Sequence, residues 1–391
     1  MKKLTLFVLC ACMVGISCSP SDTSKMHTIN LPEALDNMGL VNISELAKSI
    51  RYIPLETKEE SLIGEYPYIS YDGKHIIVAD RQTNIIRVFD NDGRFIRNIN
   101  RIGRGPEEFS STISNVSLVD GNIVVMTGRE VVEYDISDHF VRRVAVPHVD
   151  GYGVMEPVII GENCYAAVLY DITSADKEYC AVMYDSLSNV NQLIAVPDNS
   201  GLQTSLSEGM GVGIMLARLF QNNERSLLFY PESKEILSIS TFGAIDTAYV
   251  IEYGGCRIPD GNTYNASQND RYISLLSLVE SEDYLFMKMN TMATITTSGS
   301  RFMNFLYDKK TRKSAVLYDK AEDRRGFRDD IGNGPEFWPK SVYGKKVLLS
   351  DIEAFSLLEF AENHTLSKDF ERVVATIDEN SNPVVVIVEL K

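Results

Sequence analysis

The densest group of charged side chains in this sequence, Asp323-Arg324-Arg325-Gly326-Phe327-Arg328-Asp329-Asp330, lies shortly before Trp338, the only tryptophan. Aromatic rings stack on sugars, and arginine holds a carboxylate through two parallel hydrogen bonds. Arg324, Arg328 and Trp338 are therefore candidate residues for binding a carbohydrate or a carboxylate. In the alternative interpretation, the segment is a solvated, salt-bridged loop and Trp338 packs inside the protein.

A second candidate segment is the loop Gly103-Arg104-Gly105-Pro106-Glu107-Glu108-Phe109, with Arg101 just before it. Two glycines allow unusual backbone angles and Pro106 fixes φ, so the loop could present Arg101 and Arg104 to an anion or a sugar. A Gly-x-Gly without a following helix is not a phosphate-binding fingerprint. The sequence favours the alternative, a connector whose arginine pairs with Glu107 or Glu108.

Motifs for catalysis, metal binding or cofactor binding are missing from the sequence. The five histidines show neither H-x-H nor H-E-x-x-H spacing, and no Gly-x-Ser-x-Gly occurs. Asp90-Asn91-Asp92-Gly93 resembles the start of a calcium loop but lacks the remaining ligand spacing, so we interpret it as a hairpin turn. We predict no catalytic residue, metal or cofactor. Two carboxylates from distant strands could still form a hydrolytic pair.

The N-terminus has the features of an export signal. Lys2 and Lys3 precede the apolar segment Leu4–Ile16, which is too short to span a bilayer, and small residues then precede Cys18. We expect residues 1–17 to be a lipoprotein signal peptide and Cys18 to be lipidated, although Cys12 also fits the local pattern. An ordinary secretory signal is the alternative. Residues 18–42 would then form a tether and lead-in, and the lipid would be the only membrane contact.

Charge and cysteine content narrow the class of protein further. The formal charge is −16, and loss of residues 1–17 removes two lysines and no acid, which gives −18. A nucleic-acid-binding protein needs a basic surface, so nucleic acid is not an expected partner.

Cys164, Cys180 and Cys256 remain after the signal, without any C-x-x-C pair. We expect buried thiols, with a Cys164–Cys180 disulfide as a less favoured alternative.

Short strands alternating with polar turns fill the chain from residue 43 to 391. His75–Asp80, Ile85–Asp90 and Arg94–Asn100 show the alternation of half-buried strands, and the same plan recurs to the C-terminus. Propeller blades have four strands and repeat about every 40–50 residues, which favours six blades here. The near copy of the first loop, Gly332-Asn333-Gly334-Pro335-Glu336-Phe337, supports a repeat over a β-sandwich. We therefore predict an all-β, six-bladed propeller of four-stranded antiparallel blades, in one domain.

The two ends of the repeat region are predicted to meet. A propeller exposes sheet edges unless its first and last blades are joined. Arg51–Leu55 and Pro383–Leu390 are strands suited to pair in one blade. Glu353–Glu362 is the best candidate for a helix, and Leu202–Phe220 is an expected excursion between blades.

Several of these segments carry a resemblance to a known family. Val78-Ala79-Asp80, Ile85–Asp90, the Gly103–Phe109 loop and the 329–339 segment resemble bacterial six-bladed β-propeller lipoproteins related to the NHL-type propellers. The resemblance implies an exported protein of the cell envelope, periplasmic or at the cell surface, that binds a glycan, a peptide or an envelope protein. The alternative is a hydrolase or lyase with its active site at the central channel.

Overall fold

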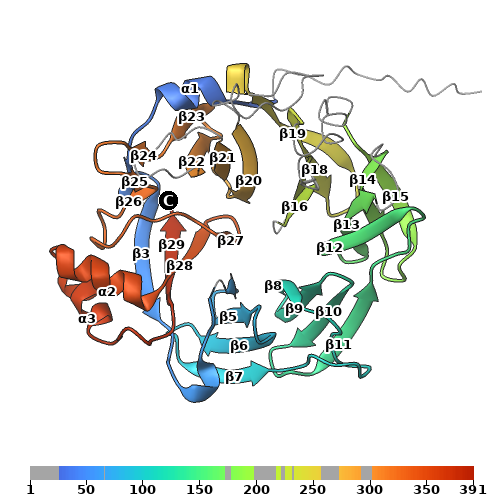
Figure 1. Ribbon diagram of the computed structural model, residues 1–391, viewed down its shortest axis with the longest axis horizontal. Helices are drawn as coiled ribbons and strands as arrows, with labels where there is room; N and C mark the ends of the chain where they lie inside the picture. Colours follow the sequence, from blue (N-terminus) through green and yellow to red (C-terminus); the bar gives the residue numbers. More distant parts are fainter. Residues whose placement is uncertain are drawn as a thin grey trace, which may run out of the picture.

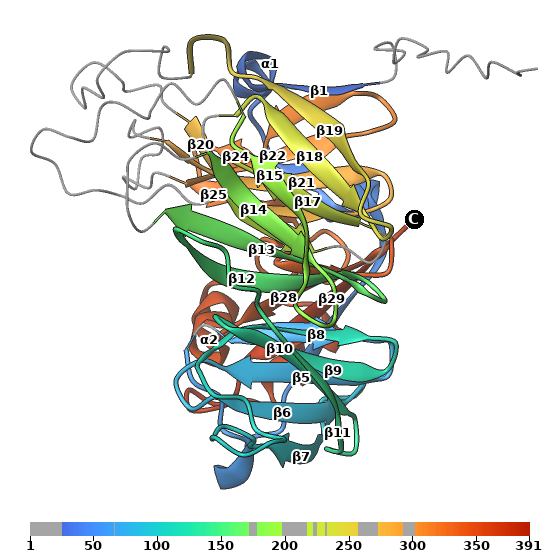
Figure 2. The same ribbon diagram turned by 90° about the vertical axis from the view of Figure 1, so that its right-hand side faces the viewer.

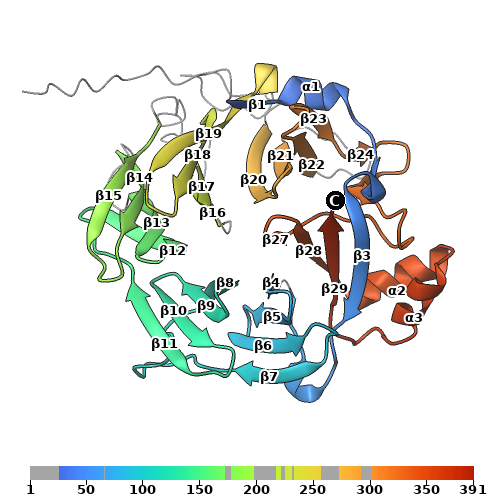
Figure 3. The same cartoon turned by 180° about the vertical axis from the view of Figure 1, so that it is seen from behind.

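The computed structural model describes residues 26–65, 67–171, 178–197, 217–221, 225–230, 233–256, 273–291 and 302–391. Six antiparallel sheets stand side by side in a ring around a central channel (Figures 1 and 3). The predicted six-bladed propeller is confirmed. Each blade starts with an inner strand at the channel and moves outward along the chain, except that the sixth blade takes its outermost strand from the N-terminal part.

The first three blades follow one another without interruption. Their strands, from the channel outward, are β4 (Tyr68–Tyr71), β5 (His75–Asp80), β6 (Ile85–Asp90), β7 (Phe95–Ile99), β8 (Ile113–Val119), β9 (Asn122–Thr127), β10 (Glu130–Asp135), β11 (Phe140–Ala145), β12 (Tyr152–Gly161), β13 (Cys164–Asp171), β14 (Tyr179–Tyr184) and β15 (Val190–Ala195).

The other three blades carry the additions to the basic plan. Their strands are β16 (Arg218–Gln221), β17 (Arg225–Phe229), β18 (Glu235–Ser240), β19 (Ile245–Glu252), β20 (Ile273–Glu280), β21 (Tyr284–Thr291), β22 (Phe302–Asp308), β23 (Lys313–Val316), β27 (Ser341–Tyr343), β28 (Val347–Ile352), β29 (Val384–Leu390) and β3 (Ala47–Pro54). Short pairs β2 (Val41–Asn42) with β26 (Phe327–Arg328), and β24 (Tyr318–Asp319) with β25 (Arg324–Arg325), lie between blades five and six.

An aspartate recurs at the turn between the third and fourth strands of a blade. The Asp90 carboxylate accepts hydrogen bonds from the backbone amides of Asp92 and Arg94, both at 2.9 Å. Asp135, Asp185 and Asp308 bind the amides of their own turns in the same way. Aspartate favours turns because its side chain can replace a backbone acceptor. The predicted hairpin turn at Asp90–Gly93 is therefore confirmed.

The predicted closure of the ring is also confirmed. β29 pairs antiparallel with β3, so that Val384 lies opposite Pro54 and Ile387 opposite Arg51. On its other side β29 pairs with β28. Its valines are almost completely buried because neighbouring sheets cover both faces of the blade.

Residues 27–36, which the sequence places in the lead-in, pack on the outside of the ring. β1 (His27–Asn30) runs parallel to β19 as a fifth strand of the fourth blade (Figure 3). Helix α1 (Leu31–Asp36) follows, and the Asn30 side chain accepts a hydrogen bond from the Glu33 amide to cap it. Leu31 and Ala34 are buried, so this segment is part of the folded body.

Two helices are inserted between β28 and β29. The predicted helix is present as α2 (Ala354–Asn363), whereas α3 (Lys368–Val374) was not predicted. Leu357 and Phe370 pack on Val384 at the base of the insertion. None of the helices in the described ranges is long and apolar enough to cross a bilayer.

Cys180 and Cys256 are buried, as the sequence predicted, whereas Cys164 is half-buried. Cys164 and Cys180 carry free thiols, and burial raises the pKa of Cys180 to about 12. The register that pairs Val168 with Ala181 places Cys164 and Cys180 at opposite ends of their hairpin. Cys18 and most of Leu202–Phe220 lie outside the described residues.

The buried side chain of Asn382, just before the closing strand β29, gives the first prediction. The Asn382 side chain is 2% exposed; it accepts a hydrogen bond from the Ile63 amide and donates to the carbonyls of Glu56 and Ser61, all at 2.9 Å. In Asn382→Asp the carboxylate would face both carbonyls, so we expect a loss of about 2–4 kcal/mol in unfolding free energy. Urea unfolding measures it. Asn380→Asp, at an exposed position, is the control, and equal midpoints for the two variants would contradict this role.

Candidate binding site in the central channel

The two Gly-Pro loops occupy equivalent places in the propeller. Gly103–Phe109 lies between the outer strand β7 and the next inner strand β8, and the 332–337 loop lies between β23 and β27. We call the side of the ring that carries such outer-to-inner connections the connector face, and the opposite side the turn face. Both loops lie on the connector face. Figure 2 shows α2 toward this face and the C-terminus at the turn face.

Each Gly-Pro loop is held by a buried phenylalanine and a carboxylate. The Phe109 amide donates to the Arg101 carbonyl, and the Phe337 amide to the Phe327 carbonyl, both at 2.9 Å. Glu108 accepts from the Gly105 amide at 2.7 Å. In the second loop, Asp329 is 3% exposed and accepts from the Gly332 and Gly334 amides at 2.8 Å. The Tyr52 hydroxyl also donates to Asp329, at 2.8 Å.

The four arginines predicted to bind ligand lie in two separate groups, Arg101 and Arg104 between β7 and β8, and Arg324 and Arg328 between β23 and β27. Arg101 pairs with Asp138 at 2.9 Å, and Arg324 lies 3.1 Å from Glu322 and 3.3 Å from Glu336. Arg104 and Arg328 are exposed. None of these four side chains lines the cavity described next. Their role in ligand binding stays a prediction.

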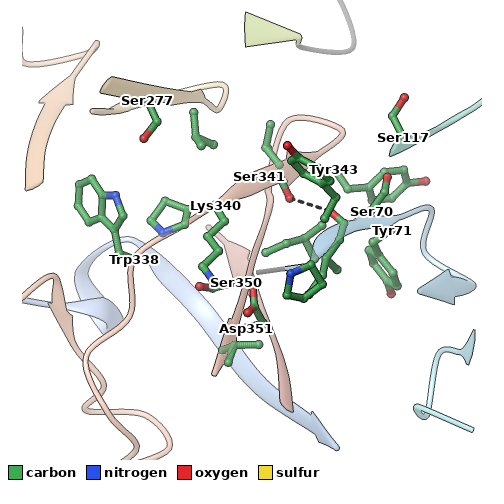
Figure 4. Close-up of a pocket in the computed structure, with 18 of the residues that line it drawn as sticks. Ser70, Tyr71, Ser117, Ser277, Trp338, Lys340, Ser341, Tyr343, Ser350 and Asp351 are labelled. Carbon is green, nitrogen blue, oxygen red and sulfur yellow. Dashed lines mark hydrogen bonds and ion pairs between the residues drawn. The ribbon is translucent and has the colours of Figure 1, made fainter. Parts of the chain in front are cut away.

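A cavity of about 680 Å³ occupies the central channel and brings together inner strands of five blades. Trp338, the fifth predicted residue, lines it (Figure 4). Pockets of about 300–1,000 Å³ hold small ligands. Among the described residues, the serine, asparagine and glutamine side chains at its wall are Ser70, Asn115, Ser117, Gln221, Ser277, Asn304, Ser341 and Ser350.

Some of these serines join neighbouring blades. The Ser341 hydroxyl donates to the Ile69 carbonyl at 3.4 Å, and the Ser70 hydroxyl accepts from the Leu118 amide at 3.0 Å. They therefore link blade six to blade one and blade one to blade two. Structural bonding accounts for Ser70 and Ser341, so they are weak evidence for a ligand.

One face of the fifth blade changes from apolar to polar within two residues. Val279, Phe286 and Leu306 are aligned across β20, β21 and β22 and belong to the apolar cluster between blades five and six. The next row on the same face, displaced by two residues along each strand, is Ser277, Lys288 and Asn304. We call these three residues the polar row. All three line the cavity.

The segment entering blade six, residues 335–340, forms another part of the cavity wall. The Trp338 ring is half-buried and stacks on Phe327 with an interplanar angle of 14° and centroids 5.9 Å apart. Phe286 meets Trp338 edge to face. Lys340 reaches Asp351 at 2.8 Å. Trp338 therefore packs partly against Phe327 and Phe286, as the alternative interpretation expected, and it also lines the cavity.

Comparison with known proteins places the chain in a family. Residues 26–389 match the family described as "Domain of unknown function (DUF4934)". The chain belongs to this family. No curated protein matches it in sequence.

Two solved structures from Bacteroides are similar in fold. One, described as a presumed exported protein of Bacteroides fragilis NCTC 9343, is 17% identical with a TM-score of 0.67 and covers 94% of this chain and 99% of its own. The other, described as a member of the DUF4221 family from Bacteroides vulgatus ATCC 8482, is 11% identical with a TM-score of 0.50 and covers 88% and 97%. At these identities the likeness shows the fold alone.

Each carboxylate among the described residues of the cavity wall is paired with a cation. Glu336 faces Arg324, Asp351 faces Lys340, and Glu280 binds Lys309 at 2.8 Å and the Nε of Arg225 at 3.1 Å. Tyr249 also donates to Glu280. Burial acts to raise the pKa of Glu280, but the hydrogen bond from Arg225 and the charges of Lys309 and Arg225 outweigh it and lower the pKa to about 2. Within the described ranges, no three His, Cys, Asp or Glu side chains are grouped to hold a metal.

The polar row was not predicted from the sequence. Lys288 interrupts the apolar strand 284–289, and Asn304 sits within Phe302-Met303-Asn304-Phe305-Leu306. A polar residue at an inward position of an otherwise apolar strand is the signal that could have identified each one. The three side chains lie next to one another because of the register of β20, β21 and β22, and the sequence alone does not show this register.

The shifted pKa of Glu280 predicts how acid affects stability. Because the folded-state pKa is about 2 and the ordinary value is 4.5, the carboxylate stabilises the fold above pH 4.5, and this contribution is lost as the pH falls toward 2. We expect Glu280→Gln to be less stable than the parent at pH 6, and the difference to shrink between pH 4.5 and 2.5. Urea unfolding at several pH values measures it. A difference independent of pH would show that Glu280 does not act through its charge.

Proposed function

We propose that this protein is an exported, lipid-anchored propeller that binds a ligand in its central cavity. The observation that carries the proposal is a cavity of about 680 Å³ whose wall combines hydroxyl, amide and aromatic side chains from five blades. Rigid scaffolds commonly place binding residues on converging loops and strand ends. A glycan fits this wall best, because sugars need hydrogen-bonding groups beside aromatic surfaces.

Export and anchoring are supported by the N-terminal sequence. Lys2, Lys3, the apolar segment Leu4–Ile16 and Cys18 form the pattern of a lipoprotein signal. The similar Bacteroides fragilis protein is itself described as presumed exported. A single acyl chain binds membranes reversibly, whereas several chains together give stable anchoring.

The position of β1 orients the cavity relative to such an anchor. β1 runs parallel to β19, so His27 lies at the turn face and Asn30 toward the connector face (Figure 2). The chain thus enters the folded body at the turn face. A lipid at Cys18 would keep this face toward the membrane and would direct the connector face, with its Gly-Pro loops, toward the surroundings.

The paired carboxylates favour binding over the alternative hydrolase or lyase. A hydrolytic pair needs one carboxyl group to give a proton and another to accept one or attack. Glu280, Glu336 and Asp351 are each engaged in an ion pair with lysine or arginine, so none of them is free to act as a proton donor or nucleophile without losing that contact. These groups are suited to fix the wall of the cavity.

Lipidation is tested by replacing the expected acceptor. Cys18→Ala should abolish incorporation of labelled palmitate in the cells that produce the protein, because the thioether bond needs this thiol. Cys12→Ala is the matched control and should retain the label. Persistent labelling of Cys18→Ala, or loss of label in Cys12→Ala, would assign the anchor elsewhere.

The location of the ligand is tested by filling the cavity. A glycan array probed with residues 19–391 would supply the ligands, and Ser277→Phe should weaken their binding at least tenfold because the ring occupies the channel. Ser277 is exposed to the cavity. Thr112→Phe, exposed on the connector between β7 and β8, should bind as the parent does. Unchanged binding by Ser277→Phe would place the site outside the channel.

A further inference from the structure

Lys288 is a cation of the cavity wall that has no counter-charge among the described residues. No carboxylate in the described ranges lies within ion-pair distance of it; its charged contact is with the ring of Phe302, 5.1 Å from the centroid. The other wall lysine, Lys340, is neutralised by Asp351. Lys288 is exposed and lines the cavity.

Asn304, beside Lys288 in the polar row, is a buried amide without a partner in the part of the chain that the structure describes. Its side chain is 8% exposed, lines the cavity, and makes no hydrogen bond to any described residue. Its amide atoms are open to the cavity and are therefore available to a ligand, since polar groups in protein interiors are nearly always hydrogen-bonded to protein, water or a ligand. An unpaired amide next to an unpaired ammonium group points to an external acceptor of hydrogen bonds.

The electrostatic setting of the polar row also favours an anion. Burial, then the charges of Lys340 and Arg325, lower the pKa of Lys288 below its ordinary value. Burial is the larger cause, and the two neighbouring cations add to it; a bound negative charge would oppose both effects. Its structural contact with Phe302 is of the kind worth only about 0.5–1 kcal/mol at exposed sites, and it leaves Asn304 unexplained.

We propose that the cavity binds an acidic oligosaccharide whose carboxylate is held by the Lys288 amine and the Asn304 amide, next to the Ser277 hydroxyl. This inference rests on the proposed binding function and specifies its ligand. The sugar ring carrying the carboxylate would lie against the polar row and beside the Trp338 segment, since both line the cavity; Figure 4 shows Ser277 of the row and Trp338. The remaining hydroxyl and amide groups of the wall suit the uncharged part of a glycan better than an apolar peptide.

The test uses a panel of uronate- and sialate-containing oligosaccharides together with neutral ones. The tightest acidic binder is then compared by calorimetry with its carboxyl-reduced form, which differs only in the charged group. We expect the reduced form to bind at least about tenfold more weakly, the value of one charge-assisted hydrogen bond. Binding of neutral glycans alone, or equal binding of both forms, would overturn the inference while leaving a cavity-binding function in place.

Variants at Lys288 identify the charged contact. Lys288→Met should reduce affinity for the acidic glycan about tenfold or more and leave affinity for the carboxyl-reduced form unchanged. Lys288→Arg should retain part of the affinity because it keeps the charge. Lys313→Met, at the exposed first residue of the outer strand β23, is the matched control and should bind normally. An equal effect of Lys288→Met on both glycan forms would contradict a carboxylate at this amine.

A variant at Asn304 distinguishes a ligand contact from a purely structural role, because it is measured for both stability and affinity. Asn304→Leu replaces an amide that makes no hydrogen bond to a described residue by an apolar group of similar size, so the thermal midpoint should change little. Affinity for the acidic glycan should nevertheless fall. If Asn304→Leu lowers the midpoint and leaves affinity intact, Asn304 is a structural residue and the proposed contact is wrong.

Discussion

Pairing of β29 with β3 is the interaction on which the rest of this structure depends. Six twisted sheets in a row would leave an exposed edge at each end, and an edge invites aggregation. Here a strand from the N-terminal part completes the last blade, so the pairing joins residues 47–54 to residues 384–390. Asn382 ties the start of β29 to the loop that leads into blade one. Closure of the ring brings distant segments into fixed relation, and the cavity exists because of that relation.

In a closed ring, polar side chains on the packed face of a blade indicate a place where water or a ligand can be bound. Neighbouring blades pack face to face through apolar side chains, and between blades five and six this contact includes Val279, Phe286 and Leu306. Toward the connector face the same surface turns polar at Ser277, Lys288 and Asn304. Polar groups at this depth destabilise a packed interface unless they meet water or a ligand. The cavity separates the blades at this point, which accommodates these groups.

The sequence predicted the repeated architecture because local chemistry encodes it. Alternating strands and turns such as Asp90–Gly93 need only a few neighbouring residues, and the valine-rich end of the chain signals a buried strand. The polar row depends instead on the alignment of three strands, which no single segment reveals. The charged segment 323–330 illustrates the opposite difficulty, because charge density alone does not show whether partners lie within the protein. Arg324 meets Glu322 and Glu336, and Arg325 meets Asp323.

The two Gly-Pro loops have the same anchoring contacts but stabilise different parts of the protein. Phe109 and Phe337 anchor both loops in the same manner. In the first loop, Arg101 closes on Asp138 of the next blade, so its charge stabilises the contact between blades. In the second loop, the buried Asp329 holds the glycines and fixes the backbone that leads to Trp338 and Lys340. The connection from β23 to β27 also carries two extra strand pairs, β2–β26 and β24–β25. These extra strand pairs support the cavity wall beside blade five. The connection that differs most from the repeated plan therefore lies next to the blade that carries the polar row.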